Sequence, residues 1–460
     1  MKTYLFYDIE TTGLNPAFDQ VLQFAAIRTD ETFNTLDEKE IVIRLRDDIV
    51  PAPGAVLTHQ ISPENMQEGL PEVEGIRAIH ALMNEPGTVS LGYNTLGFDD
   101  EFLRFGFYRN LLTPYTHQFA NQCARMDIFP ITVLFYLFGE CDLRWPMLDG
   151  RVSLKLENIN AENNLASGQA HDAMVDVRAT LALARRLKAN TAMWAYASGY
   201  FNKLEDAKRM EQLSFAFSDT SFKEAILVDS KLGYGQHFQT FALCLGQHRH
   251  YRNQWCFLRL DREELAETTI DSLEKTTWCM KKKLAEAPFI LPTKKRFMRH
   301  FSEDRLAIVE NNQRFLQNNP EILEAITNHY LDYKYPLVPD ADLDSILYQS
   351  DFLSRRDQNT ALNFHEAKPE LKQHFIEEFE TAENRELALR IIGRNYPEAL
   401  SERYADKYQQ YLARCFYAKD YRGQDKLTPE TALAALQSSE AENKSLINDL
   451  LSLYTRRAKF

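Results

Sequence analysis

The sequence predicts an α/β domain at the N-terminus, followed by a β-containing region and then by a helical region. In the first 190 residues, short runs of aromatic and β-branched residues come first, and helical patterns then alternate with further strands. That order of elements is typical of an α/β fold. The 460 residues, of which 44% are hydrophobic and 26% charged, have the composition of an ordinary globular protein with two to four domains.

The α/β domain is expected to end between Leu187 and Asn190, where a helix rich in alanine, leucine and arginine stops. A turn with the sequence Thr-Thr-Gly-Leu-Asn-Pro follows the first predicted strand. The predicted strands are residues 3–9, 20–28, 40–45 and 88–93, and the predicted helices are residues 71–83, 98–110 and 170–187.

Beyond residue 190 the pattern changes to a small β-barrel or sheet with helical insertions, and from about residue 343 it is almost entirely helical. A helix start is clear at Thr428, an N-cap residue that precedes Pro429 at the first helical position. The short β-like runs are residues 225–229, 237–245 and 254–260, and the helical patterns between them and the helical region are residues 262–284 and 303–331.

Several classes of protein are excluded or disfavoured by these patterns. The most apolar stretch, residues 128–138, contains Pro130 and is too short to span a bilayer, which needs about 20 residues. The N-terminus has no signal-peptide pattern, so a cytoplasmic protein without a membrane partner is expected. Six scattered cysteines form no CxxC pair, which disfavours a zinc ribbon or a redox pair.

The net charge of −13 is unusual for a protein that binds nucleic acid, but it says little about where the charges lie. Residues 281–300 contain seven lysines and arginines and a single acid, Glu286. Carboxylates of a metal site also count as negative charges until the metal binds. The acidic total therefore does not exclude a basic track for DNA.

Two acids on the first predicted strand, Asp8 and Glu10, form a candidate metal-binding pair. Side chains alternate along a strand, so residues two positions apart point to the same face. Two adjacent carboxylates repel each other unless a cation lies between them, and Mg²⁺ prefers such oxygen ligands. Taken alone, the pair is equally well explained as a solvated strand end, because D-x-E triplets are common in an acidic chain.

A second candidate comprises Asp99 and Asp100, which begin the helix predicted directly after the strand at residues 88–93. Acids in this position often serve only as caps or as partners of the helix dipole. Either residue could supply a metal ligand. Asp99 is favoured because it directly follows Phe98, which can anchor the turn.

A third candidate is the pair His171 and Asp176. Histidine is the natural general base near neutral pH. Five positions would place the two side chains on different faces of a helix, so the pair works only if His171 lies at or before the helix start. An isolated H-x4-D is otherwise explained by a histidine near a helix N-terminus and an ordinary surface acid.

The three candidates together suit phosphodiester hydrolysis by two metal ions, which supply a deprotonated water and stabilise the leaving oxygen. The set D-x-E-T-x-G, Y-N-x(3)-F-D and H-x(4)-D resembles the DEDD superfamily of 3′→5′ exonucleases in its His subclass. The Tyr subclass would have tyrosine at the position of Asp172. The resemblance narrows to the bacterial exonuclease I family in residues 23–30, 53–57, 91–104 and 171–174.

The resemblance implies a ribonuclease H-like nuclease domain with a mixed sheet at residues 1–190, an SH3-like domain at 191–342 and a helical C-terminal domain at 343–460. It implies that Asp8, Glu10 and Asp176 bind two Mg²⁺ ions directly, with Mn²⁺ as a substitute. Asp99 would be the fourth acid, acting through water, and His171 the general base. Glu10 would also lie beside the terminal nucleotide.

The resemblance further implies substrate contacts, at positions where the sequence matches the family less closely than in the catalytic motifs. Lys155 replaces an arginine usual in the family, which keeps the charge but loses bidentate phosphate binding. Phe119 stands where tryptophan is common, so stacking on a base should survive. The family's basic residues at 132–139 are not matched. The expected contacts are Glu10, Arg104, Tyr115, Phe119, Lys155, Tyr196 and Lys203.

The implied activity is processive 3′→5′ hydrolysis of single-stranded DNA to 5′-mononucleotides in DNA repair and recombination. The implied partners are single-stranded DNA and the acidic tail of single-stranded DNA-binding protein, and the chain is expected to be a monomer. Residues 281–300, with Phe289, Phe297 and Met298 interleaved, are a candidate wall for the DNA; the alternative is a solvated basic surface.

Three other functions are compatible with parts of the sequence. An RNA-directed 3′→5′ exonuclease shares the nuclease motifs, but the long C-terminal extension favours DNA. A catalytically inactive binding protein with a nuclease fold is disfavoured because all four acids and the histidine are present. A proofreading subunit predicts stable association with a polymerase.

Overall fold

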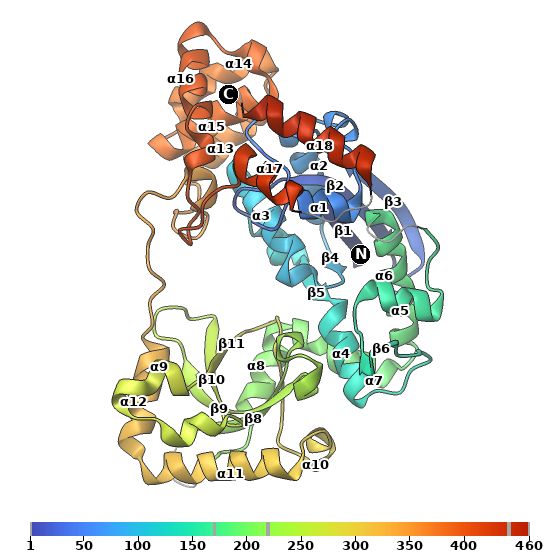
Figure 1. Ribbon diagram of the computed structural model, residues 1–460, viewed down its shortest axis with the longest axis vertical. Helices are drawn as coiled ribbons and strands as arrows, with labels where there is room; N and C mark the ends of the chain where they lie inside the picture. Colours follow the sequence, from blue (N-terminus) through green and yellow to red (C-terminus); the bar gives the residue numbers. More distant parts are fainter. Residues whose placement is uncertain (1, 169–171, 218–220, 439–442, 459–460) are drawn as a thin grey trace. The chain divides into compact units, whose positions relative to one another are not determined.

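The computed structural model describes residues 2–168, 172–217, 221–438 and 443–458, and the chain divides into two compact units (Figure 1). The first unit contains residues 1–125, 166–181 and 337–460. The second contains residues 126–165 and 182–336. Segments that lie far apart in the sequence therefore build the first unit together. Among the described residues, no helix is both long and apolar enough to cross a lipid bilayer.

In the described part of the chain, the first unit is built on a five-stranded mixed sheet in the order β3-β2-β1-β4-β5, which confirms the predicted α/β class. β1 pairs antiparallel with β2 and parallel with β4, and β2 pairs antiparallel with β3. The strands are β1 (Thr3–Thr11), β2 (Val21–Thr29), β3 (Thr35–Val42), β4 (Thr88–Gly92) and β5 (Ala124–Asp127).

The prediction of a strand at residues 40–45 was wrong in its position, because β3 begins at Thr35. This strand lies at the edge of the sheet and is almost fully exposed. Charged residues dominate its sequence, as is common where an edge must resist pairing with other chains. The apolar pattern used for prediction therefore pointed to the wrong residues.

The acids of β1 lie at the end of a face whose first residues, Tyr4 and Phe6, are buried against Phe33. Leu5, Tyr7 and Ile9 pack in a cluster with side chains of α2 and α3. Because side chains alternate along a strand, Asp8 and Glu10 point to the opposite face. The helices that the nuclease part contributes are α1 (Pro53–His59), α2 (Glu72–Met83), α3 (Asp99–Arg109) and α6 (Ala173–Lys188).

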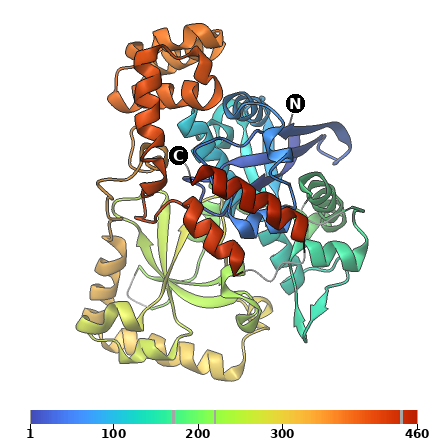
Figure 2. The same cartoon turned by 45° about the horizontal axis from the view of Figure 1, so that its top comes forward.

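The C-terminal helices complete the hydrophobic core of the first unit. Leu450 and Tyr454 of α18 share a buried cluster with Leu22 of β2 and Val56 of α1. Figures 1 and 2 both draw α17 and α18 alongside the N-terminal segment that holds α1. The helices are α13 (Arg355–Glu366), α14 (Pro369–Lys372), α15 (Ala382–Asn395), α16 (Glu402–Leu412), α17 (Pro429–Gln437) and α18 (Lys444–Arg457).

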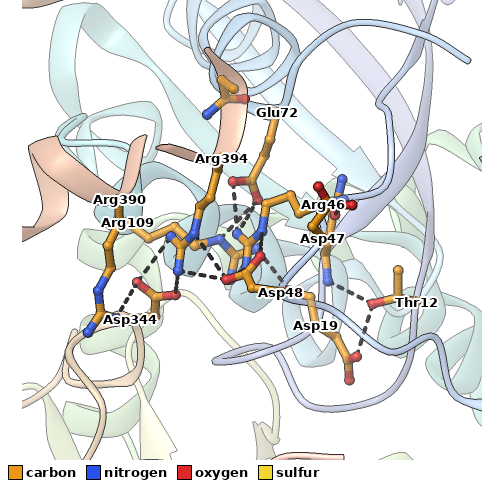
Figure 3. A network of polar contacts seen from close by, with 12 residues as sticks. Thr12, Asp19, Arg46, Asp47, Asp48, Glu72, Arg109, Asp344, Arg390 and Arg394 are labelled. Atoms are coloured by element: carbon orange, nitrogen blue, oxygen red, sulfur yellow. Dashed lines mark hydrogen bonds and ion pairs between the residues drawn. The ribbon is translucent and has the colours of Figure 1, made fainter. Parts of the chain in front are cut away.

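A buried network of charges also joins the nuclease part to these helices (Figure 3). Arg46 pairs with Asp48 at 2.9 Å and with Glu72 at 2.8 Å. Arg394 of α15 pairs with Asp48 at 2.9 Å and also with Asp344. Burial acts to raise the pKa of Asp48, but Arg394 and Arg46 outweigh it and hold that pKa well below its usual value.

The second unit holds a five-stranded antiparallel sheet, in the order β11-β10-β9-β8-β12 within the described residues. Its strands are β8 (Lys223–Val228), β9 (Gln239–Gln247), β10 (Gln254–Arg259), β11 (Cys279–Lys283) and β12 (Phe289–Leu291). Its longer helices are α4 (Ile128–Phe138), α5 (Leu156–Asn163), α7 (Thr191–Ser198), α8 (Lys203–Glu211), α11 (Glu303–Asn318) and α12 (Pro320–Leu331). Short elements are β6 (Met147–Leu148), β7 (Arg151–Val152), α9 (Leu273–Thr276) and α10 (Lys295–Met298).

Two helical predictions in this unit need correction. Residues 262–284 are not one helix, because only the short α9 is α-helical and residues 279–283 form β11. Pairing with β10 overrides the helix propensity of the three lysines there. Residues 303–331 form two helices, because the chain breaks at Asn319 and Pro320 then occupies the first turn of α12.

Candidate functional site

Three of the predicted acids meet at the face of β1 that points away from α2 and α3. Asp8 and Glu10 come from β1 and Asp176 comes from the first turn of α6. One carboxylate oxygen from each residue lies within 4.8 Å of those of the other two, and all three residues are partly buried. Three carboxylates at this spacing suit a divalent cation that prefers oxygen ligands.

The start of α6 is fixed by Asp172, which the sequence analysis did not select. Its Oδ1 accepts hydrogen bonds from the backbone N–H groups of Met174 at 3.0 Å and of Val175 at 3.2 Å. This N-cap begins the helix at Ala173 and so places Asp176 in the first turn. Aspartate just before an apolar helical pattern was the signal that could have revealed it.

His171, the expected general base, lies outside the described residues. The expectation for this residue required it to lie at or before the start of the helix. The described helix begins at Ala173, two positions further along the chain.

The loop between β4 and α3 is shaped by the Y-N-x(3)-F-D motif and the glycine before it. A Cβ at Gly92 would collide with the carbonyl oxygen of Tyr7, so glycine lets β4 lie close to β1. Asn94 adopts a left-handed conformation with φ 66°, which asparagine tolerates better than most residues. Phe98 packs on the core and contacts the ring of Phe102 at 4.7 Å. The turn thus begins α3 at residue 99.

Asp99 is directed towards the acidic pair on β1. Its Oδ1 accepts a hydrogen bond of 3.2 Å from the backbone N–H of Ile9, which lies between Asp8 and Glu10. Asp99 is 5% exposed. Its negative charge is among the causes that raise the pKa values of both acids on β1.

Asp100 has a different environment. It is fully buried and pairs with Arg125 at 2.5 Å, Arg104 at 3.1 Å and the ring of His117 at 2.8 Å. Burial acts to raise its pKa, but Arg125 and Arg104 outweigh burial and lower it. The structure therefore separates the two aspartates that the sequence left open, because only Asp99 faces the acidic cluster.

The acids of the cluster are held where their charges are unfavourable. Burial is the largest cause of the raised pKa of Asp8, followed by the charges of Asp99, Glu10 and Asp176. Burial and the charge of Asp176 raise the pKa of Glu10 to about 8. Carboxylates that resist ionisation near neutral pH are typical of a site completed by a cation.

Among the substrate contacts expected in the first unit, Arg104 and Tyr115 lie together and Phe119 is exposed by itself. The guanidinium of Arg104 lies 5.8 Å from the ring centre of Tyr115 and 5.9 Å from that of Tyr348. Tyr348 was missed, and no local pattern indicates it, because it lies more than 230 residues further along the chain. Phe119 is 65% exposed, as a residue that stacks on a base would be.

The remaining expected contacts belong to the second unit. Lys155 is exposed, directly precedes α5 and lies 3.5 Å from the carboxylate of Glu157. The ring of Tyr196 on α7 is covered by the guanidinium of Arg209 at 4.6 Å. Lys203 is exposed at the first position of α8.

The candidate DNA wall at residues 281–300 is only partly what was expected. Phe289 and Phe297 are buried, so the expectation that aromatic rings alternate with the cations at the surface was wrong for them. Lys282 is also fully buried and pairs with Asp206 at 2.7 Å. Lys282 lies on β11 and Phe289 on β12, where their side chains are buried. Phe297 lies on α10, and its ring packs edge-on against that of Phe138. The exposed cations are Lys294, Lys295, Arg296 and Arg299.

Comparison with known protein families gives two matches. Residues 5–184 match the family described as Exonuclease, and residues 341–457 match the Exonuclease I C-terminal domain. Exodeoxyribonuclease I of Escherichia coli is 28% identical over 443 residues, which cover 92% of this chain and 91% of that protein. The enzyme of Haemophilus influenzae is 32% identical over 290 residues, which cover 62% of this chain and 60% of that protein.

Solved structures agree with these matches. Escherichia coli exonuclease I in complex with a dA16 oligonucleotide superposes with a TM-score of 0.85 at 25% identity and covers all of both chains. Structures of a complex of SSB and exonuclease I with an inhibitor and of a zinc-bound complex of exonuclease I with single-stranded DNA have TM-scores of 0.82 and 0.83 at 25% identity and cover 99% or more of both chains.

The mixed sheet with its acidic cluster, matched over residues 5–184, defines an exonuclease. The two family matches and the relatives that span nearly the whole chain specify it further. The chain belongs to the bacterial exonuclease I family.

Proposed function

We propose that this protein is a processive 3′→5′ exonuclease that hydrolyses single-stranded DNA to 5′-mononucleotides. The observation that carries the proposal is the meeting of Asp8, Glu10 and Asp176 within 4.8 Å. Membership of the exonuclease I family supports the substrate, because a solved relative from Escherichia coli holds a dA16 oligonucleotide.

The acids are proposed to hold two divalent ions, Mg²⁺ under physiological conditions with Mn²⁺ as a substitute. Asp8, Glu10 and Asp176 would be direct ligands, and Asp99 would act through water. The zinc-bound relative supports a divalent cation in this family. When bound, the ions would lower the pKa of the attacking water and stabilise negative charge on the phosphate.

The side chains of the chain itself position the substrate and move the proton. His171 would accept the proton of the water that attacks the terminal phosphodiester in line, and Glu10 would lie beside the 3′-terminal nucleotide. Arg104 and Tyr115 already contact each other, and Tyr115 offers a ring for a base. Arg104 is 9% exposed and pairs with Asp100 and Glu101, so it would hold that ring beside the substrate. Phe119, Lys155, Tyr196 and Lys203 complete the proposed contacts.

The cellular role forms part of the same proposal. We place the nuclease domain at residues 1–190, the SH3-like domain at 191–342 and the helical domain at 343–460. The solved complex of SSB with a relative supports an interaction with the acidic tail of single-stranded DNA-binding protein. A cytoplasmic monomer that acts in DNA repair and recombination is proposed from the family likeness.

The test is a degradation assay with 5′-labelled single-stranded DNA, duplex DNA and RNA, with Mg²⁺ or with EDTA. We expect a ladder that shortens from the 3′ end on single-stranded DNA alone and disappears with EDTA. Asp8→Asn and His171→Ala should each remove the ladder. Glu68→Gln, a change of an exposed acid outside the cluster, is the matched control and should cleave normally.

Three results would replace the proposal. Degradation of RNA in preference to DNA would make the protein an RNA-directed exonuclease. Binding of DNA without cleavage in either metal would make it an inactive nuclease-fold protein. Full activity of Asp8→Asn would remove the acidic cluster from the mechanism.

A further inference from the structure

A polar pocket lies within the first unit, between α2 and the helices α13 and α14. Its volume is about 510 Å³. Arg77 lines it from α2, and His365, Lys372 and Tyr396 line it from the C-terminal helices and the residue after α15. None of these residues belongs to the acidic cluster or to the proposed substrate contacts. A volume of this size accommodates a small organic ligand.

Two cations converge in this pocket on one backbone oxygen. The carbonyl of His365 accepts hydrogen bonds from Nη1 of Arg77 at 3.0 Å and from Nζ of Lys372 at 3.2 Å. Because both nitrogens contact the same atom, they lie within about 6 Å of each other, close enough for their charges to repel. Lys372 is 3% exposed and also donates to the carbonyl of Phe364 at 2.5 Å.

Neither cation has a carboxylate partner. In the described ranges of the chain, no acidic oxygen lies within salt-bridge distance of Arg77 or Lys372, whereas Arg46 and Arg394 of the buried network each pair with two acids. The acid that lines the pocket, Glu74, accepts a hydrogen bond from the hydroxyl of Tyr396 at 2.6 Å. The two cations therefore outnumber the one acid at this pocket.

The electrostatics of neighbouring groups reflect this excess of positive charge. Burial, together with the charge of Arg77, lowers the pKa of Lys372 to about 8. Burial and the charges of Arg77 and Lys372 lower the pKa of His365 to about 3. A neutral histidine keeps one ring N–H that can donate a hydrogen bond. An anion in the pocket would relieve the repulsion between the cations.

We propose that this pocket binds a small ligand through a phosphate or phosphomonoester group. Arginine presents a planar fork of N–H donors that matches phosphate oxygens, and lysine adds a compact charge with three donors, of which two are used on carbonyl groups. The hydroxyl of Tyr396 and the ring of His365 line the remaining space. The site is separate from the proposed exonuclease reaction and does not depend on it.

The test measures binding of inorganic phosphate and of deoxyadenosine 5′-monophosphate to the full-length protein by titration calorimetry. EDTA is present, because the acidic cluster without cations repels phosphate. We expect one saturable site that Arg77→Gln and Lys372→Met each weaken by about tenfold or more. Lys407→Met is the matched control, since Lys407 is an exposed lysine of α16 outside the pocket, and it should bind like the wild type.

The two ligands distinguish the sources of the phosphate group. Similar affinities would indicate free phosphate, and tighter binding of the nucleotide would indicate a nucleoside monophosphate. No saturable binding of either ligand below about 10 mM would overturn the proposal, as would unchanged affinity in both folded variants. If Lys372→Met does not fold, phosphate must still protect Arg77 of the wild type from phenylglyoxal, measured by mass spectrometry; absence of protection would also refute the site.

Discussion

Without a bound cation, the folded protein disfavours the charged form of Glu10. Its pKa is about 8 in the folded protein, against 4.5 as the ordinary value expected in the unfolded chain. Between these pH values the folded protein retains a proton that the unfolded chain releases. Stability from this group is therefore fully present below about pH 4.5 and is lost as the pH rises to about 8.

Replacing this acid should stabilise the protein when no cation is bound. Glu10→Gln is expected to raise the melting temperature at pH 8 in EDTA by a few °C, with a smaller difference at pH 5. Mg²⁺ should stabilise the wild type more than the variant, because the cation compensates the carboxylates. Calorimetry over this pH range measures both effects. Glu68→Gln should follow the wild type, and a variant that melts lower at pH 8 would contradict the argument.

Asp99 and Asp100 are neighbours with opposite predicted phenotypes. Asp99→Asn should lower the exonuclease rate by roughly 10–100-fold, as expected for a group acting on a metal through water, and should leave the fold intact. Asp100→Asn should instead lower the free energy of unfolding by about 3 kcal/mol, because Arg104 and Arg125 lose a buried partner. Steady-state cleavage rates and urea unfolding separate the two effects. The assignment fails if Asp100→Asn is the stable, inactive variant.

For single residues, the sequence predicted the acids of the site but not the residues that hold the site in place. Asp8, Glu10 and Asp176 could be predicted because the spacing of their motifs is typical of carboxylates that bind metal ions. Asp172 could have been recognised as a cap. Tyr348 could not, because its contact with Arg104 depends on how the C-terminal segment returns to α3.

Among the elements, α6 depends on its cap for both stability and position. Asp172→Ala removes the acceptor of two backbone N–H groups and should cost about 1 kcal/mol. The exonuclease rate should fall as well, because the first turn holds Asp176. Asp172→Ser keeps an N-cap oxygen and should restore most of the stability, as measured by urea unfolding. Equal stability of the alanine and serine variants would show that the cap contributes little.

Helices and strands with a regular spacing of apolar residues were predicted well. Strands whose conformation depends on pairing with a strand elsewhere in the sequence were not. β1, α2 and α3 lie close to their predicted positions because their apolar residues face the core. β11 was read as helix because its lysines favour a helix, while its actual conformation comes from pairing with β10. Local sequence carries no information about that partner.

For the whole molecule, the buried charge network is the feature most sensitive to one substitution. Arg394→Met leaves Asp48 and Asp344 buried with fewer cations, and we expect a loss of about 3–5 kcal/mol in the free energy of unfolding. The lowered pKa values of both acids mean that their contribution is present above their ordinary pKa values and is lost as the pH falls through the lowered ones. Arg403→Met, at an exposed arginine, is the control for urea unfolding of both proteins at pH 7. An unchanged midpoint in Arg394→Met would show that the network contributes little.

The order of the three regions along the chain was predicted correctly, and how they pack together was left open by the sequence. The sequence suggested a helical region that follows the others, whereas the helices after residue 341 share a compact unit with the nuclease sheet. Contacts such as that between Tyr411 and Asp48, 363 positions apart, leave no trace in local composition.

The place of α18 in this unit has a consequence for synthesis. Ribosomes synthesise Leu22 and Val56 early, and the side chains of Leu450 and Tyr454 that cover them follow 394 to 432 residues later. Until then, a nascent chain has β1 with its acids next to a hydrophobic cluster that is still exposed to solvent. We therefore expect the cluster around Leu22 and Val56 to stay open to solvent until α18 has been synthesised, so that the nuclease sheet gains its full stability late in translation.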